Sequence, residues 1–249
     1  MSGSRPVTYR ISARYLGTAA LVLLAFIVGT AVSADHGPDT YAKAHVSVVA
    51  VEPTWPGYNR PGFGAPPGSA PAGTGVYFGQ DARSRYLITA AHVVTRATRV
   101  EIVDHAGTRH DADIVAVDTA RDVAVLRSGY AAAPIAVNSE DPAIGIHACA
   151  IGNSFGLGLS FTCGVVSAVH RRNVGFNAIE DFVQTDAAIN PGASGGALVD
   201  PQGRLIGLID GIFTKEADID AGVNFAISVP MLRKSLETLR SQDVAIPRL

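Results

Sequence analysis

Residues 185–199 read TDAAINPGASGGALV and carry the most structural information in the chain. Ser194 stands among three glycines, directly before an apolar run that we expect to be a strand. Glycines at such a turn let backbone N–H groups point into one space, as stabilising the negative charge on an attacked carbonyl oxygen requires. The same residues also fit a glycine-rich hairpin turn with an incidental serine. Whether the chain also contains a base and an acid that could act with the serine decides between these two interpretations.

A serine nucleophile needs a neutral base and a carboxylate that orients the base. The chain has 7 histidines and none follows Ser194, which excludes the order serine, acid, histidine of α/β-hydrolases. His92 ends the run LITAAH, whose small residues leave room around an imidazole, and Asp122 opens the run DVAVL at the mouth of a buried strand. Asp118 is a second candidate acid, but no apolar strand follows it directly. The order His92, Asp122, Ser194 therefore remains open.

The rest of the chain predicts an all-β protein. From Tyr41 onward, about twelve short apolar runs rich in β-branched residues are separated by Gly, Pro, Asn and Asp, as in barrels and sandwiches. The first of these predicted strands is His45–Val51. Only the stretch at about 229–242 has a clear helical pattern. No helix alternates with the strands, which disfavours a doubly wound α/β sheet.

Together these blocks resemble the chymotrypsin-like serine proteases and, within them, the HtrA/Deg family. The resemblance spans roughly residues 73–230. The matching blocks are Gly73–Val76, the TAAH block ending at His92, the DVAVL block beginning at Asp122, Ala150–Leu157, Gly164–Ala168, Gln184–Leu198 and Gly222–Ile227. The resemblance implies two six-stranded antiparallel β-barrels at about 41–133 and 143–228, divided near Pro134–Pro142, and a C-terminal helix.

The resemblance also implies a mechanism. His92 would take the proton of Ser194 as the hydroxyl attacks a peptide carbonyl, while Asp122 holds the imidazole. The backbone N–H groups of Gly192 and Ser194 would form the oxyanion hole. This chemistry needs no metal and no organic cofactor, and its partners would be protein or peptide substrates bound along the strand Leu205–Ile212.

Three positions shape the expected specificity and activation. Ala188 and Ile189 correspond to the floor of the primary substrate pocket, and since neither is charged we expect a small or medium aliphatic residue before the scissile bond. Ala193 stands where HtrA/Deg proteases usually have Asn and digestive proteases have Asp. An alanine cannot pair with a newly formed N-terminal amine, so we do not expect activation of the trypsin type.

Two alternatives to an endopeptidase stay open. One is a chaperone-like peptide-binding module with little hydrolysis, which Ala193 and the lack of a PDZ module within this sequence would suit. The other is an esterase that uses the same triad. Related proteases are often trimers through their N-terminal segments, so a homo-oligomer is a further expectation.

The N-terminal segment 1–34 predicts export. Residues 1–34 contain three arginines and no acid, and the stretch 16–34 is uncharged and apolar. The small residues Val32-Ser33-Ala34 suit cleavage of a signal peptide, whereas the length of the run also suits a membrane anchor. In either case we expect residues 35–249 to form a protease domain in the periplasm, cell envelope or medium.

Charge and cysteine content refine this expectation. The chain carries a formal charge of −2, and beyond residue 34 it has 17 basic and 22 acidic residues, so a nucleic-acid partner is not expected.

The only cysteines, Cys149 and Cys163, flank a turn-rich stretch and would pair if their strands form a hairpin; two buried thiols are the alternative. A cluster of acids and histidines at 104–113 could suggest a metal site, but Gly107 marks a solvated hairpin turn instead.

Overall fold

The computed structural model describes residues 36–56, 72–81, 84–212 and 222–249. The expected export segment 1–34 and most of the loop between the first two strands lie outside the described residues. The elements in chain order are α2 (His36–Ala44), β1 (Val48–Thr54), β2 (Gly73–Gln80), β3 (Arg85–Ala90), α3 (Ala91–Val94), β4 (Arg99–Val103), β5 (Arg109–Asp118), β6 (Val123–Ser128), β7 (His147–Gly152), β8 (Ser160–Arg171), β9 (Phe182–Thr185), β10 (Ala197–Val199), β11 (Leu205–Ile212), β12 (Asn224–Ser228) and α4 (Val229–Arg240). None of the described helices is long and apolar enough to cross a bilayer.

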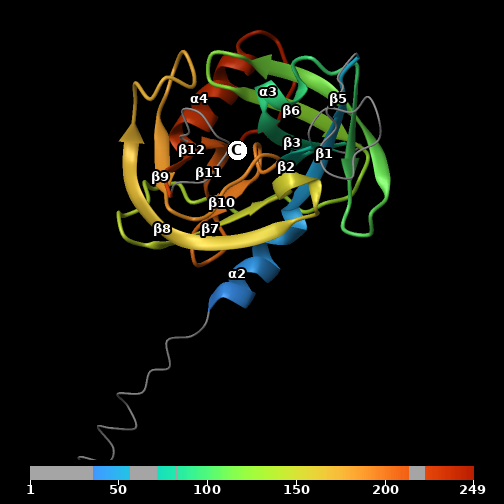
Figure 1. Ribbon diagram of the computed structural model, residues 1–249. Coiled ribbons are helices and arrows are strands. Elements are labelled where there is room, and N and C mark those ends of the chain that lie inside the picture. The colour runs from blue at the N-terminus through green and yellow to red at the C-terminus, as the bar shows by residue number, and fades with distance from the viewer. Residues whose placement is uncertain (1–35, 57–71, 82–83, 213–221) are drawn as a thin grey trace, which may run out of the picture. The chain divides into compact units, whose positions relative to one another are not determined.

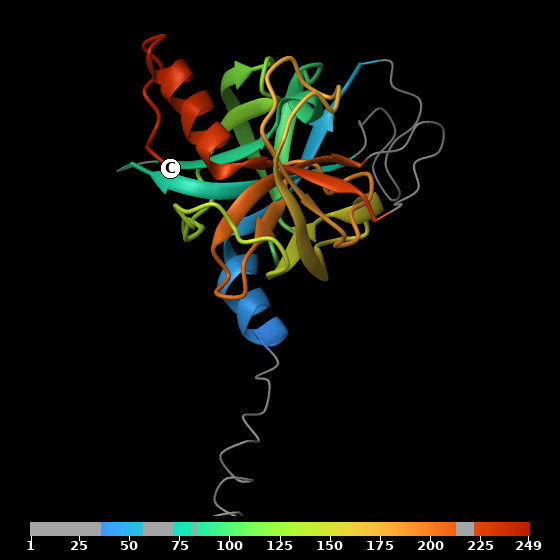
Figure 2. The same cartoon turned by 90° about the vertical axis from the view of Figure 1, so that its left-hand side faces the viewer.

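The strands close into two antiparallel barrels, which confirms the predicted fold (Figures 1 and 2). The first barrel has the strand order β1-β2-β3-β6-β5-β4 and the second has the order β10-β11-β12-β9-β8-β7. Side chains such as Leu87 and Ile102 fill the first barrel, and Leu198 and Ile206 fill the second. A further apolar cluster takes residues from both barrels and from α4, so the two halves share one continuous core.

Helix α4 forms where the sequence predicts a C-terminal helix. Its N-terminus is capped by Ser228, whose side chain accepts a hydrogen bond from the backbone N–H of Met231, and Pro230 lies in the first turn. The apolar face buries Leu232 and Leu236 completely. This face packs against β11 and β12 of the second barrel and against β5 of the first.

The prediction that only the C-terminal stretch is helical was wrong in two places. Residues His36–Ala44 form α2, which lies against the second barrel, where the Thr40 hydroxyl donates a 2.7 Å hydrogen bond to the Pro201 carbonyl. A helix of two turns owes its stability mainly to such docking, so its sequence gives a weak signal. The single turn α3 is too short to show any periodicity. The predicted strand His45–Val51 also begins later, because His45–Ser47 form a turn of 3-10 helix.

Candidate active site

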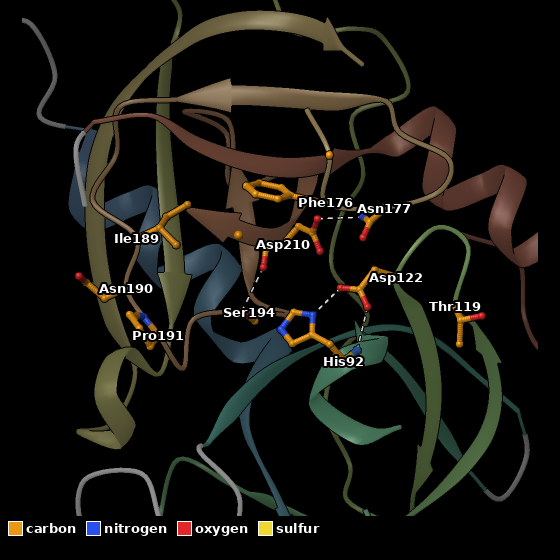
Figure 3. Close-up of a pocket in the computed structure, with 12 residues that line it drawn as sticks. His92, Thr119, Asp122, Phe176, Asn177, Ile189, Asn190, Pro191, Ser194 and Asp210 are labelled. Atoms are coloured by element: carbon orange, nitrogen blue, oxygen red, sulfur yellow. Dashed lines mark hydrogen bonds and ion pairs between the residues drawn. The ribbon is translucent and has the colours of Figure 1, made fainter. Parts of the chain in front are cut away.

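His92 and Asp122 meet because the strands that carry them are neighbours. β3 pairs with β6 so that Ala90 lies opposite Val123, which places the start of α3 beside the turn that precedes β6. Asp122 Oδ2 accepts a 2.6 Å hydrogen bond from His92 Nδ1, and Oδ1 accepts one of 2.8 Å from the His92 backbone N–H (Figure 3). The carboxylate therefore fixes both the backbone and the ring of the histidine.

The double contact with Asp122 determines which ring nitrogen of His92 can accept a proton. Asp122 is buried, and burial alone would raise its pKa, but the hydrogen bonds from His92 and from Asp210 outweigh burial and hold the pKa below its ordinary value. A charged carboxylate requires the proton on Nδ1 of His92, so Nε2 is the nitrogen left to accept a proton. The side chain of His92 is 52% exposed, which leaves that nitrogen accessible from outside.

Asp118, the second candidate acid, lies elsewhere. Its Oδ2 forms a 2.8 Å ion pair with Arg121 and accepts a 2.8 Å hydrogen bond from the Ser235 hydroxyl of α4. Asp118 therefore ties the first barrel to the C-terminal helix, and the structure places Asp122 alone of the two beside His92.

Ser194 lies in the turn between β9 and β10 and lines the same pocket as His92 and Asp122 (Figure 3). The pocket has a volume of about 580 Å³. The hydroxyl Oγ of Ser194 donates a 3.2 Å hydrogen bond to the backbone carbonyl of Asp210 rather than to His92. A rotation of this side chain would be needed before His92 could take its proton, and such looser geometry is common in unliganded sites.

Two backbone N–H groups beside Ser194 are fixed in direction by their own peptide units. The carbonyl oxygen of Pro191 accepts a 2.6 Å hydrogen bond from Phe155 N–H, and that of Ala193 accepts one of 2.9 Å from Gly196 N–H. Because C=O and N–H point in opposite directions across a trans peptide, the N–H groups of residues 192 and 194 point away from these acceptors. Within the described residues neither N–H donates a hydrogen bond.

Gly192 allows this geometry and Thr74 of the first barrel holds it. The φ angle of Gly192 is +98°, a conformation that strongly favours glycine. The buried Thr74 hydroxyl donates a 2.7 Å hydrogen bond to the Gly192 carbonyl and accepts one of 2.9 Å from Asn153 N–H. The Thr74 backbone N–H also donates to the Ser194 carbonyl at 2.9 Å. We did not identify Thr74 from the sequence, although it lies in the first of the matching blocks.

Ala193 needs no charged partner in this arrangement. Its backbone N–H donates a 3.0 Å hydrogen bond to the Asn190 carbonyl, and its side chain is buried. A Cβ atom added to Gly152 would lie 2.8 Å from Cα and Cβ of Ala193, so the two residues are in direct contact. Packing and a backbone hydrogen bond thus hold Ala193 in place.

Of the two residues expected at the pocket floor, only Ile189 lines the pocket (Figure 3). Ala188 is exposed, and its carbonyl oxygen accepts a 2.6 Å hydrogen bond from the Thr162 hydroxyl. Phe176, from the loop between β8 and β9, also lines the pocket and makes that side of it apolar.

The pocket also contains an acidic residue that our sequence analysis missed. Asp210 of β11 is only 4% exposed, and its Oδ2 accepts a 3.0 Å hydrogen bond from the Asn177 side chain. Glu180 holds the loop around Asn177 by accepting four backbone N–H groups, from residues 174–177, at 2.6–3.1 Å. The signal in the sequence was a single acid within the apolar strand Leu205–Ile212.

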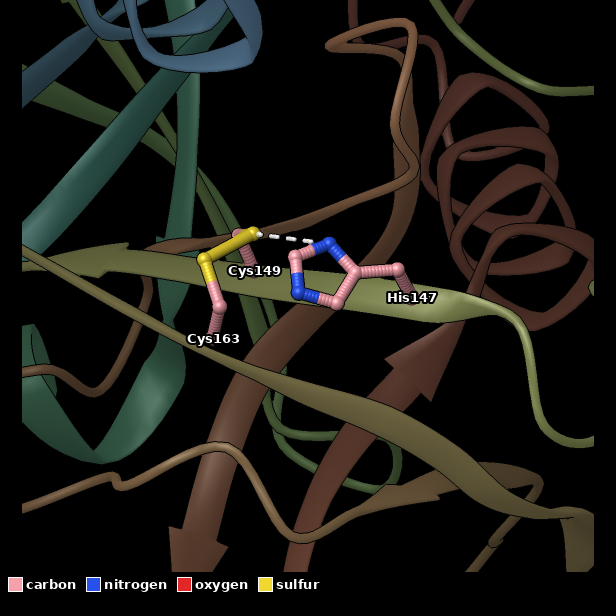
Figure 4. Close-up of side chains that lie close together, drawn as sticks. All are labelled: His147, Cys149 and Cys163. Atoms are coloured by element: carbon pink, nitrogen blue, oxygen red, sulfur yellow. Dashed lines mark hydrogen bonds between the residues drawn. A yellow bond between two sulfur atoms is a disulfide. The ribbon is translucent and has the colours of Figure 1, made fainter. Parts of the chain in front are cut away.

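Cys149 and Cys163 form a disulfide, as predicted (Figure 4). The two residues lie directly opposite each other on β7 and β8, which are antiparallel neighbours. The side chain of His147 lies beside this bridge, with Nδ1 3.8 Å from the Cys149 sulfur. Both sulfurs are bonded to each other, so this group offers no thiolate for a metal.

The acids and histidines at 104–113 lie around the hairpin between β4 and β5, with Gly107 at the turn. Asp104 accepts hydrogen bonds from the backbone N–H groups of Ala106 and Thr108, both at 2.9 Å, and from His110 Nε2 at 2.8 Å. Asp111 and Asp113 pair with Arg99 and Arg127 instead. The cluster thus has the contacts of a hairpin with exposed ion pairs.

Comparison with known proteins identifies the family. The profile of the trypsin-like peptidase domain matches residues 73–208. The chain belongs to the family of trypsin-like peptidase domains. This trypsin-like chain is 38% identical to the periplasmic serine endoprotease DegP of Escherichia coli K12 over 164 residues, which cover 65% of the chain and 34% of DegP. It is 38% identical over 171 residues to a probable periplasmic DegP-like endoprotease of Chlamydia trachomatis, covering 68% of the chain and 34% of the relative.

Solved structures of HtrA-type and other serine endoproteases are also similar to this chain. The HtrA-type protease AlgW with a bound tripeptide superposes with a TM-score of 0.70 at 34% identity, covering 82% of this trypsin-like chain and 62% of AlgW. The serine endoprotease of Yersinia pestis superposes with a TM-score of 0.67 at 31% identity, covering 86% of the chain and 69% of that protein. The resemblance to HtrA/Deg proteases is thereby confirmed, while the chain spans about a third (34%) of the length of the curated relatives.

Proposed function

We propose that this chain is an exported serine endopeptidase that hydrolyses peptide bonds of unfolded or flexible proteins. His92 would be the general base, Asp122 its orienting acid and Ser194 the nucleophile. The observation that carries the proposal is that the doubly bonded His92–Asp122 pair and Ser194 line one pocket, next to two backbone donors that are not used elsewhere among the described residues.

In the proposed reaction, Ser194 Oγ leaves the Asp210 carbonyl, gives its proton to His92 Nε2 and attacks the substrate carbonyl carbon. The N–H groups of Gly192 and Ser194 receive the developing oxyanion. His92 then donates the proton to the leaving amine, and the C–N bond breaks to leave an acyl-enzyme. Water next attacks the acyl carbon while His92 takes its proton, and His92 returns that proton to Ser194 Oγ as the acyl C–O bond breaks and the carboxylic acid product leaves. Each such donor typically contributes about 3 kcal/mol to transition-state stabilisation.

Two finer proposals concern specificity and location. Ile189 and Phe176 make the pocket wall apolar, which supports a small or medium aliphatic residue before the scissile bond. Strong cleavage after Lys or Arg would contradict this. Export into the periplasm or cell envelope is supported by the periplasmic relatives, with residues 1–34 as signal or anchor and residues 35–249 as the catalytic domain.

A fluorophosphonate probe and unfolded casein test the proposed activity. The wild-type chain should become labelled and should cleave casein, whereas Ser194→Ala should do neither. Ser139→Ala, at an exposed serine between the barrels, is the matched control and should behave as wild type. Absence of both labelling and cleavage in the wild type would indicate a peptide-binding module, and ester turnover without casein cleavage would indicate an esterase.

A further inference from the structure

Asp210 forms a pair of buried carboxyl groups with Asp122. One oxygen of each, together with one ring nitrogen of His92, lie within 4.8 Å of one another. At this separation a hydrogen bond between the two carboxyl groups would require that one of them carries a proton, because two carboxylates can only accept. Two ionised carboxylates this close in a buried site would repel each other strongly.

The surroundings show which of the two keeps its charge. Asp122 accepts two N–H hydrogen bonds from His92, which favour the carboxylate form. From the described part of the chain, the Asp210 carboxyl accepts one hydrogen bond, from the neutral side chain of Asn177. The charge therefore belongs on Asp122.

The titratable groups that face Asp210 agree with this assignment. Among the residues that the structure describes, they are Asp122 from the turn before β6, His92 from α3 and Glu180 from the loop between β8 and β9. The neighbouring strands β10 and β12 contribute no titratable side chain. Burial, and next the hydrogen bond with Asp122 and its charge, raise the pKa of Asp210 well above its ordinary value.

We propose that Asp210 stays protonated and donates its O–H hydrogen bond to Asp122, which makes it a positioning residue for the pair His92–Asp122. The proposal rests on the proposed function, since it assigns Asp210 a role in orienting the general base. Asn177 donates to Oδ2 of Asp210, and Glu180 fixes the loop of Asn177. With the proposed bond from Asp210 to Asp122, a connected series of hydrogen bonds would run from that loop to His92.

The protonated acid gives the site an upper pH limit. Loss of the proton removes the donor to Asp122 and places a second negative charge beside it. The pair would separate, and Asp122 would no longer hold His92 in the same position. Activity should therefore decrease at alkaline pH because Asp210 loses its proton.

Two substitutions separate the proton from the hydrogen bond. Asp210→Asn keeps a donor toward Asp122 and cannot ionise, whereas Asp210→Ala removes the donor. Asp200→Asn is the matched control, because Asp200 is buried in the β10–β11 hairpin but pairs with Arg204. Rates of fluorophosphonate labelling at Ser194 are measured across pH, and infrared spectra of the full chain record protonated carboxyl groups.

We expect the wild type and Asp200→Asn to lose labelling rate at alkaline pH and Asp210→Asn to retain it. Asp210→Ala should be slower by about ten- to a hundredfold, as expected when a hydrogen bond to a charged group is lost. The infrared band of a protonated carboxyl should be present at neutral pH in the wild type and absent in Asp210→Asn.

Equal pH profiles of wild type and Asp210→Asn, or an unchanged infrared band in Asp210→Asn, would overturn the proposal. If Asp210→Asn does not fold, the infrared band of the wild type is followed from neutral to alkaline pH. The band should be present at neutral pH and disappear as the pH rises, and its absence at neutral pH would contradict a protonated Asp210. Failure of Ser194 labelling in every variant would instead refute the proposed function, while the infrared band would still report the proton.

Discussion

The hydroxyl of Thr74 in the first barrel donates a 2.7 Å hydrogen bond to the carbonyl oxygen of Gly192 in the second. The same hydroxyl accepts the N–H of Asn153, so one buried side chain joins three segments. The direction of the backbone donors beside Ser194 thus depends on a residue from the other half of the molecule.

Thr74→Val tests this dependence, because valine keeps the shape and loses the hydroxyl. Two buried backbone groups would lose their partner, so we expect about 1–3 kcal/mol lower stability. Labelling of Ser194 by a fluorophosphonate should slow by about tenfold, as a donor moves away from its required position. Thr238→Val, on an exposed part of α4, is the control and should leave labelling unchanged. An unaffected rate in Thr74→Val would show that the loop holds itself.

Gly195→Ala should be far more damaging than the same change at Gly107. Both glycines have a φ of +82°, so alanine costs about 1–2 kcal/mol at either position. A Cβ at Gly195 would also overlap with the Thr74 carbonyl and the Thr89 hydroxyl, whereas nothing lies within 4 Å at Gly107. Thermal unfolding should show a further loss of about 1–3 kcal/mol for Gly195→Ala. Equal melting temperatures for the two variants would contradict the described packing.

The Cys149–Cys163 disulfide should contribute measurable stability. The two residues are 14 apart in the sequence. A disulfide that closes a loop of this size lowers the entropy of the unfolded chain and so raises the free energy of unfolding by about 3 kcal/mol. The double variant Cys149→Ala, Cys163→Ala should lose about that much in urea unfolding and should no longer respond to a reductant. The wild type treated with reductant should match it, and a wild type insensitive to reductant would argue against the bond.

His170 should make stability depend on pH. Its Nδ1 lies 3.0 Å from Asp181 and its Nε2 lies 3.1 Å from Asp141, and the hydrogen bond and charge of Asp181, followed by the weaker effect of Asp141, raise the pKa of His170. A raised pKa in the folded state means that the contribution is complete below the pKa of the unfolded chain. It is lost as pH rises through the folded value.

His170→Asn should therefore destabilise the protein in mildly acidic solution and have little effect in alkaline solution, measured by urea unfolding. His105→Asn is a control of opposite sign, since burial lowers the pKa of His105 and its removal should help at acidic pH. A His170→Asn effect that does not change with pH would exclude the charged pair.

The strands could be predicted because their signals are local, whereas the two six-stranded barrels and the His92–Asp122 contact were expected from the resemblance to the HtrA/Deg proteases. Each strand shows its own run of apolar residues, and His92 and Asp122 each lie at the end of such a run. Asp210 and Thr74 could not be predicted in this way, because their importance comes from neighbours that are distant in sequence. Asp210 contacts Asn177, 33 residues earlier, and Thr74 contacts Gly192, 118 residues later.

The helices missed by the sequence analysis have a similar cause. α2 is only nine residues long and depends on contacts such as that of Thr40 with Pro201, which no local pattern records. α3 contains only four residues, and its first N–H is bound by the Asp122 carbonyl at 3.0 Å. Ala188 was misplaced relative to the pocket because its side chain is exposed, whereas the next residue, Ile189, is buried and lines the pocket.

The hydrogen bond between Ser235 of α4 and Asp118 has a consequence for the order of assembly. Asp118 begins the turn that carries Asp122, so the anchor for that turn is supplied by a helix that follows β1 to β12 in the sequence. During synthesis on the ribosome, α4 emerges after every strand of both barrels. A chain that ended before α4 would thus keep the proposed nucleophile, base and acid but would lose the contact that fastens the turn of the acid.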